Sequence, residues 1–126
     1  MIKIQESAEN YLETILIIGQ RKGNVRSVDI ANELDFSKPS VSVAMKKLRE
    51  SGYIVVDADG RIALTESGRK VAERIYERHR FLSDWLVALG VSPETAAEDA
   101  CRIEHVISAE SFEKLKEHAR RGAKEG

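Results

Sequence analysis

The feature that most limits the possible folds is a tight turn between two short β-favouring runs, directly behind two helical segments. Residues 53–56 (Tyr-Ile-Val-Val) and 61–64 (Arg-Ile-Ala-Leu) flank an Asp-Ala-Asp-Gly turn at 57–60. An Asp-Gly turn between such runs is typical of a β-hairpin. The two helical segments in front of it are separated by a brief turn at residues 35–36, which is the spacing of a helix-turn-helix. A hairpin behind that motif is a wing, so the pattern predicts a winged helix-turn-helix.

Helices are predicted over most of the remaining chain, because apolar residues recur every three to four positions. Serines and prolines at the expected starts supply N-caps and first-turn residues. The expected helices are Ser7–Ile18, Ser27–Leu34 capped by Ser27, one opening at Ser37 and stopping at Ser51, a long linker helix from Thr65 to Gly90, one capped by Ser92, and a last one capped by Ser108 with a frayed tail over residues 120–126. The fold class is therefore mainly α, with a second helical module behind the linker helix.

Composition bounds the class of protein. At 126 residues, with 42% hydrophobic and 33% charged residues, the chain predicts one compact body or two small ones that share a linker helix. No apolar run reaches the length of a membrane span, and the N-terminus lacks an export signal. A single cysteine, Cys101, excludes an internal disulfide framework and suits a reducing compartment. We therefore expect a cytoplasmic protein with no membrane partner.

The net charge of −1 by itself argues against nucleic-acid binding, but the distribution of the charges along the chain does not. Residues 37–49 carry four basic residues and no acidic one, and phosphate attraction acts within a Debye length of roughly 8–10 Å. Small residues at the start of this helix suit entry into a major groove about 12 Å wide. The predicted DNA contacts are Ser27 (through backbone N–H groups), Ser37, Lys38, Pro39, Ser40, Ser42, Val43 (on a thymine methyl), and Lys46, Lys47 and Arg61 (on phosphates). Winged helices also serve as protein–protein modules, and a steep loss of affinity with salt would identify the DNA binder.

Six further residues form three separated clusters that carry metal-binding chemistry. They are Asn10 and Glu13, then His79, then Cys101, Glu104 and His105. Residues three or four positions apart share a helix face, so each cluster can aim its donors at one point. Thiolate, imidazole and carboxylate together are ligands of a divalent transition metal. Each residue alone is more often a core or surface side chain. The joint pattern is more informative, although spacing by itself does not bring the clusters together.

Five runs of the sequence resemble one known family. They are SAENYLETIL (7–16), RSVDIANELDFSKPSVS (26–42), LTESGR (64–69), RHRFLSDWL (78–86) and EDACRIEHVIS (98–108). Together they resemble the iron- and manganese-dependent repressors, the family of the diphtheria toxin repressor and the manganese transport regulator. The resemblance implies a homodimer that binds a pseudo-palindromic operator in double-stranded DNA when metal is present and represses metal-uptake genes. It also implies the short, two-domain type without an SH3-like domain. We accordingly expect a DNA-binding domain over residues 1–70, and a linker helix with a dimerisation and metal-binding domain over residues 71–126.

The ligand positions that the resemblance implies are of mixed character. Glu13, His79, Cys101, Glu104 and His105 fall where the family places metal ligands. Asn10 stands where the manganese branch has Asp and the iron branch has Met. Cys101 matches the iron branch, Glu13 matches the manganese branch, and Ala97 replaces a second-site His of the iron branch. Because thiolate and imidazole favour Fe(II) over Mn(II), we expect Fe(II) first and Mn(II) second, with one or two ions per chain.

Three other functions compete with an Fe(II)-dependent repressor. One is an Mn(II)-responsive repressor of the same fold. Another is a thiol redox sensor, which would need a thiol from a second chain to pair with Cys101. A metal hydrolase with Glu104 as general base is disfavoured, because no Gly-rich loop or nucleophile elbow is visible. We therefore expect no enzyme, and a mechanism in which a metal held by both halves biases the protein towards its DNA-competent arrangement.

Overall fold

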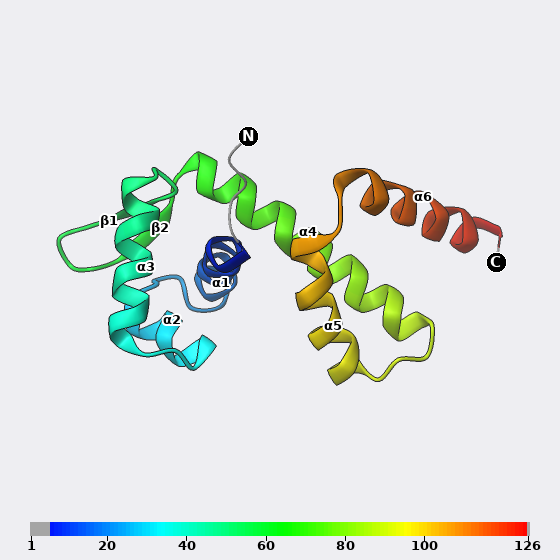
Figure 1. The fold of residues 1–126 in the computed structure, drawn as a ribbon, viewed down its shortest axis with the longest axis horizontal. Coiled ribbons are helices and arrows are strands. Elements are labelled where there is room, and N and C mark those ends of the chain that lie inside the picture. Colours follow the sequence, from blue (N-terminus) through cyan, green and yellow to red (C-terminus); the bar gives the residue numbers. More distant parts are fainter. Residues whose placement is uncertain (1–5, 126) are drawn as a thin grey trace. The chain divides into compact units, whose positions relative to one another are not determined.

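The computed structural model describes residues 6–125 and divides the chain into two compact units, Met1–Arg74 and Ile75–Gly126 (Figure 1). The boundary falls inside the fourth helix. In chain order the elements are α1 (Glu6–Lys22), α2 (Ser27–Leu34), α3 (Lys38–Glu50), β1 (Ile54–Val56), β2 (Ile62–Leu64), α4 (Glu66–Ala88), α5 (Pro93–Val106) and α6 (Ala109–Glu125). The mainly helical fold with one short β-hairpin is confirmed. Among the helices described here, none combines the length and apolar character that crossing a membrane requires.

In the first unit, α2 packs against both α1 and α3, and the apolar faces of the three helices form the core. The apolar side chains that α1 turns inward are Tyr11, Leu12, Ile15, Leu16 and Ile18, and all five are buried, with Leu12 and Ile18 fully enclosed. Helix α1 is longer than predicted, because it continues through Gly19 to Lys22. It ends at Gly23, whose φ of +88° needs glycine and whose N–H donates to the Gly19 carbonyl at 2.9 Å.

The caps of α2 and α3 show one correct and one wrong prediction. Ser37 caps α3 as expected, because its hydroxyl accepts from the Ser40 N–H at 3.2 Å. The N-cap of α2 is Arg26 and not Ser27, which is the first helical residue. The reason lies in Asp29, whose carboxylate accepts the Arg26 N–H at 2.9 Å and so fixes the turn one residue earlier.

The hairpin forms as predicted and is tied to the segment before α2. Strands β1 and β2 pair antiparallel, with Ile54 opposite Leu64 and Val56 opposite Ile62. The Asp57 carboxylate accepts the N–H groups of Asp59 and Arg61, each at 2.9 Å, and so organises the turn. On the outer side of β2, the Ile62 N–H donates to the Val25 carbonyl at 2.7 Å. That bond supports a hairpin with only three residue pairs, which alone would be marginal.

The start of α4 is packed against the residue that precedes β1. The Thr65 hydroxyl accepts the Gly68 N–H at 3.2 Å and donates to the Gly52 carbonyl at 2.7 Å. A side chain at Gly68 would place its Cβ 2.0 Å from the Tyr53 carbonyl oxygen. Only glycine fits there, because such a distance lies well inside van der Waals contact. This close approach explains the glycine of the Thr-Glu-Ser-Gly run.

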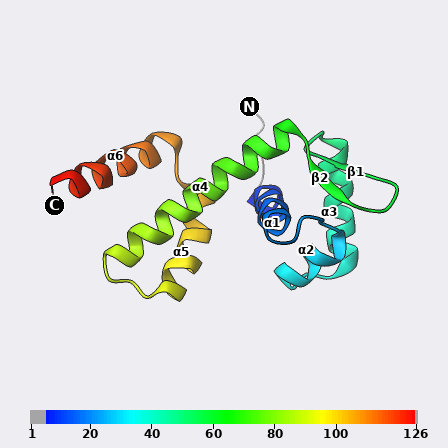
Figure 2. The same ribbon diagram turned by 180° about the vertical axis from the view of Figure 1, so that it is seen from behind.

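The second unit consists of the rest of α4 with α5 and α6, as both views show (Figures 1 and 2). Its core holds Leu82, Ala100 and Phe112, one from each helix. Ser92 and Ser108 cap α5 and α6 as predicted, accepting from Thr95 N–H and Ser111 N–H at 3.4 and 3.1 Å. The predicted frayed tail was wrong as far as Glu125, because α6 runs to that residue. Gly126 lies outside the described residues.

Candidate metal centre and recognition helix

Glu104 is the centre of the polar cluster in the second unit. Its side chain is 0% exposed, although it sits on α5 among charged and polar neighbours. One carboxylate oxygen, Oε2, accepts from His79 Nδ1 at 2.8 Å, and the other, Oε1, lies 3.3 Å from His105 Nε2. A buried carboxylate is stable only when it is paired, so the hydrogen bond from His79 helps to offset the burial of Glu104.

His79 reaches Glu104 from α4, across 25 positions of sequence. The hydrogen bond to Glu104 chiefly raises the pKa of His79 above its ordinary value, and partial burial of the ring opposes that rise. Because an ionised carboxylate can only accept hydrogen bonds, Nδ1 of His79 is the donor. This bond leaves Nε2 as the ring nitrogen with which His79 would bind a metal ion.

Cys101 and His105 complete the cluster one helical turn from each other. One ligand atom each from Cys101, Glu104 and His105 lies within 4.8 Å of the other two. The Cys101 residue is exposed, whereas the His105 side chain is only 6% exposed. Bonds of about 2.0–2.3 Å join transition metals to such nitrogen, oxygen and sulfur donors, so one ion fits a cluster of this size. Thiolate, imidazole and carboxylate are donors that a divalent transition metal accepts.

The predicted ligands Asn10 and Glu13 belong to the first unit, on α1. Glu13 is buried, with 5% of its surface exposed, and Asn10 is half-buried. The backbone carbonyl of Asn10 accepts the Thr14 hydroxyl at 2.7 Å. In the second unit, Cys101 and His105 form one group with Glu104, and His79 hydrogen-bonds to the other carboxylate oxygen of Glu104.

The predicted DNA contacts on α3 lie on its outer surface. Val41, Met45 and Leu48 face the core, whereas Lys38, Pro39, Ser42 and Lys46 are exposed. Val43 is 56% exposed, so its methyl groups are accessible to a partner. Ser37 and Ser40 are also exposed, and the Ser37 hydroxyl donates to that of Ser40 at 2.8 Å. This surface is free of acidic side chains over the whole of the predicted reading turn.

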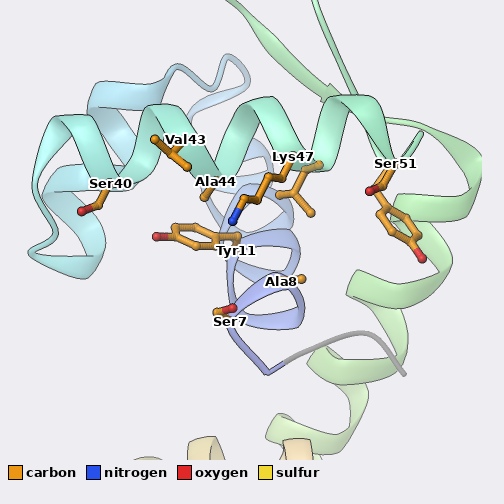
Figure 3. A pocket seen from close by; sticks show the side chains of 10 residues that line it. Ser7, Ala8, Tyr11, Ser40, Val43, Ala44, Lys47 and Ser51 are labelled. Carbon is orange, nitrogen blue, oxygen red and sulfur yellow. The ribbon is translucent and has the colours of Figure 1, made fainter. Parts of the chain in front are cut away.

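Three of these residues also line a groove between α1 and α3. Figure 3 shows Ser40, Val43 and Lys47 along the α3 wall, facing Tyr11 and Ser7 on α1. The groove has a volume of about 510 Å³. The predicted DNA-contacting surface is therefore hollowed on one side and does not consist of an isolated convex helix.

The wing carries one predicted contact and one residue that sequence reasoning missed. Arg61 is exposed at the start of β2, and Ser27 is half-buried at the start of α2. Arg26, which was not predicted, donates from Nη1 to the Asp59 carbonyl at 2.7 Å and so joins the start of α2 to the wing turn. No sequence signal links positions 33 residues apart, although an arginine followed three residues later by Asp29 could have identified the cap.

Comparisons with known proteins place both halves of the chain in one family. Residues 3–61 match the family model described as the iron dependent repressor, N-terminal DNA binding domain. Residues 65–122 match the iron dependent repressor, metal binding and dimerisation domain. A transcriptional regulator MntR from Escherichia coli O6:H1 is 36% identical over 109 residues, which is 86% of this chain and 70% of the relative.

Two further relatives extend the comparison. An HTH-type transcriptional regulator from Methanocaldococcus jannaschii is 35% identical over 115 residues, covering 90% of this chain and 92% of the relative. A manganese-dependent transcriptional repressor, solved in complex with manganese, superposes with a TM-score of 0.81 at 27% identity. That match covers 88% of this chain but 51% of the solved one, so this chain spans about half the length of that relative.

Proposed function

This chain belongs to the iron-dependent repressor (DtxR/MntR) family, and from that premise we propose that it represses transcription by binding a DNA operator when a divalent metal is bound. The family consists of transcriptional regulators, so the chain is not an enzyme, and the metal-hydrolase alternative falls away. It carries a DNA-binding domain and a metal-binding and dimerisation domain. The repressed genes, in this proposal, encode metal uptake.

The observation that carries the proposal is the fully buried Glu104 carboxylate between two imidazoles, with a thiol one turn away. Such a group of metal-ligating side chains is hard to explain as core packing, because burying a carboxylate is unfavourable. As metal ligands we propose His79, Cys101, Glu104 and His105 from the second unit, with Glu13 and Asn10 from α1. Of these, Asn10 would offer a side-chain oxygen without charge.

We propose Mn(II) as the ion, in preference to the Fe(II) that the thiol alone would favour. The likeness to a solved manganese-dependent repressor supports this choice, as do the carboxylates of Glu13 and Glu104. Cys101 keeps Fe(II) as the competing ion, because thiolate is a softer ligand than carboxylate. The experiment below therefore includes both ions, and the comparison between them decides which one activates DNA binding better.

The proposed mechanism is a linkage between metal binding and DNA binding. Ligands from α1 and from α5 joined by one ion would restrain the DNA-binding unit, and through it the recognition helix α3. In a homodimer the two recognition helices must lie about 34 Å apart to read adjacent turns of a pseudo-palindromic operator. A coupling of about 1–3 kcal/mol is typical of such linkage. The match of residues 65–122 to a metal binding and dimerisation domain supports the homodimer.

On DNA, we propose that the exposed face of α3 enters the major groove. Ser42 and Val43 would meet base edges, and Lys46, Lys47 and Arg61 would meet phosphates. With no Arg, Asn or Gln in the reading turn, DNA shape would carry much of the sequence preference. Binding should then weaken steeply with salt, as expected when counterions are released.

The test is an anaerobic selection of random duplex DNA with metal-free protein, with Mn(II), with Fe(II), and with chelator. A palindrome enriched only with metal supports the proposal, and stronger enrichment with Mn(II) supports the choice of ion. Enrichment without metal would reject metal dependence, and no enrichment in any arm would favour a protein-interaction module. Loss of binding on mild oxidation, with no metal requirement, would point instead to a redox sensor at Cys101.

Two variants sharpen the selection. Glu13→Ala should abolish metal-dependent enrichment while leaving the fold intact, because it removes the proposed link from α1 to the metal. His118→Ala is the matched control, since His118 is an exposed imidazole of α6 outside the cluster. Unchanged enrichment with Glu13→Ala would remove Glu13 from the site.

A further inference from the structure

Arg78 contacts the end of α5 from the position next to His79 on α4. Its Nη1 donates to two backbone carbonyls, that of Glu104 at 3.1 Å and that of Ile107 at 2.8 Å. Neighbouring residues of α4 therefore hold the same residue of α5 in two places. Arg78 binds the backbone of Glu104, and His79 binds its carboxylate.

The two carbonyls lie where a helix most needs an external donor. Helix α5 ends at Val106, and the carbonyls of a last helical turn have no partners within the helix. A cation at that end also interacts favourably with the helix dipole. The guanidinium thus fixes the turn that carries both Glu104 and His105.

The position of the guanidinium is itself fixed by α6. Its Cζ lies 5.4 Å from the centre of the Phe112 ring, and Phe112 belongs to the core of the second unit. Arg78 is partly buried and not a freely solvated surface arginine. One side chain therefore links α4, α5 and α6 at the point where the ligands converge.

We propose that Arg78 is a positioning residue of the metal centre: it fixes the last turn of α5 so that Glu104 and His105 present their donor atoms to one ion. The inference rests on the proposed function, because it assumes that these residues bind metal. Groups that orient metal ligands typically change affinity by about 10–100-fold when they are removed. Arg78 acts on the ligands through the backbone and has no part in the DNA-contacting surface.

The experiment is an anaerobic Co(II) titration of the full chain, followed by ligand-field absorption and by the thiolate-to-cobalt charge-transfer band. Arg78→Met keeps a long apolar stem over Phe112 but removes the donors. Lys116→Met is the matched control, because the Lys116 amine lies 5.2 Å from the same ring without bonding to α5. Far-ultraviolet circular dichroism in chelator reports whether each variant remains folded.

We expect Arg78→Met to bind Co(II) about tenfold more weakly with an altered absorption spectrum, Arg78→Lys to recover part of the loss, and Lys116→Met to match the wild type. A Co(II) affinity of Arg78→Met within twofold of the wild type, together with an unchanged absorption spectrum, would overturn this inference. The proposed function would be unaffected by that result. If Arg78→Met does not fold, Arg78→Lys decides: binding at least about threefold weaker supports the inference, and unchanged binding overturns it. Absence of Co(II) binding by the wild type would overturn the inference and the proposed function together.

Discussion

The two units hold their functional side chains in different ways. In the first unit, the proposed DNA contacts are exposed, and the helices that carry them are fixed by caps only a few residues away, such as Ser37 on Ser40. In the second unit, the proposed metal ligands converge on a fully buried carboxylate. Residues 25 and 26 positions away hold Glu104: His79 binds its carboxylate, and Arg78 binds its backbone carbonyl.

This difference predicts different responses to substitution. An exposed side chain can be removed with little strain, because water replaces its contacts. Removal of a partner from a buried charge leaves that charge unpaired, which is strongly unfavourable. Single substitutions on the DNA-binding surface should therefore cause small losses of affinity, whereas single substitutions in the metal centre should cause large losses.

Gly68→Ala should have the largest effect. It tests whether a single substitution can also strongly destabilise the first unit. A Cβ at 2.0 Å from the Tyr53 carbonyl requires the backbone to move, so we expect a loss of about 3 kcal/mol or more in the stability of the first unit. Amide hydrogen exchange, read separately for the two units, measures it. Gly122→Ala is the control, because its Cβ would meet nothing within 4 Å and the helix should gain slightly. Equal protection factors in wild type and Gly68→Ala would refute the packing argument.

Glu104→Gln comes next and tests the sharp failure of the metal centre. The amide keeps the volume of the carboxylate but loses its charge and one acceptor, so we expect metal affinity to fall about 100-fold. Isothermal titration with Mn(II) measures the change, and His118→Ala should bind like the wild type. A small effect would mean that Glu104 is a structural acceptor for the two histidines and that the ion binds elsewhere.

The sequence predicted the first unit more completely than the second, because the contacts that fix the first unit join residues close together in the chain. Its signals are local: a serine three residues before the N–H that it caps, an Asp-Gly turn between β-favouring runs, and a proline in a first turn. Even the misplaced cap of α2 was wrong by one residue only, because Asp29 competes with Ser27 for the first turn.

In the second unit, the sequence pointed to the proposed ligands but not to the contacts that position them. Residue types and one-turn spacing placed Cys101, Glu104 and His105 on one face. The burial of Glu104 and the capping role of Arg78 depend on how three helices pack, and an arginine on an amphipathic helix gives no local sign of that. The extent of α6 was also missed, because its last residues are polar and include Gly122, which disfavours a helix interior, yet the helix continues to Glu125.

Asp29→Asn should have a moderate effect and tests how the stabilisation by the Asp29 carboxylate depends on pH. The hydrogen bond from Lys22 chiefly lowers the pKa of Asp29, the Arg26 N–H also lowers it, and burial opposes both. Because the folded pKa is depressed, the stabilisation is present above the ordinary Asp pKa of about 3.9 and is lost as the pH falls through the folded value. We expect the variant to be about 1 kcal/mol less stable at pH 7. Urea denaturation at pH 7 and pH 2.5 should give a difference that disappears in acid, and a constant difference would contradict the assignment.

Arg26→Ala should have the smallest effect, because the hydrogen bond that it removes, from the guanidinium to the Asp59 carbonyl, is exposed. The Ile62 bond to Val25 would still hold β2, so we expect the wing turn to loosen without unfolding. Operator affinity should fall about two- to threefold, as for a bond worth under 1 kcal/mol. Arg21→Ala removes an equal charge from the Glu33 ion pair, away from the wing, and should leave affinity closer to the wild type.

Amide hydrogen exchange at Gly60 and Ile62 distinguishes two roles for Arg26, holding the wing in place and contacting a DNA phosphate directly. Faster exchange in the free Arg26→Ala protein, together with the small loss of affinity, would mean that Arg26 acts by holding the wing. Unchanged exchange with a reduced salt dependence of binding would mean that its guanidinium contacts phosphate directly. A loss of tenfold or more would contradict the gradual behaviour expected of the first unit, and would make its surface contacts as critical as the buried ones around Glu104.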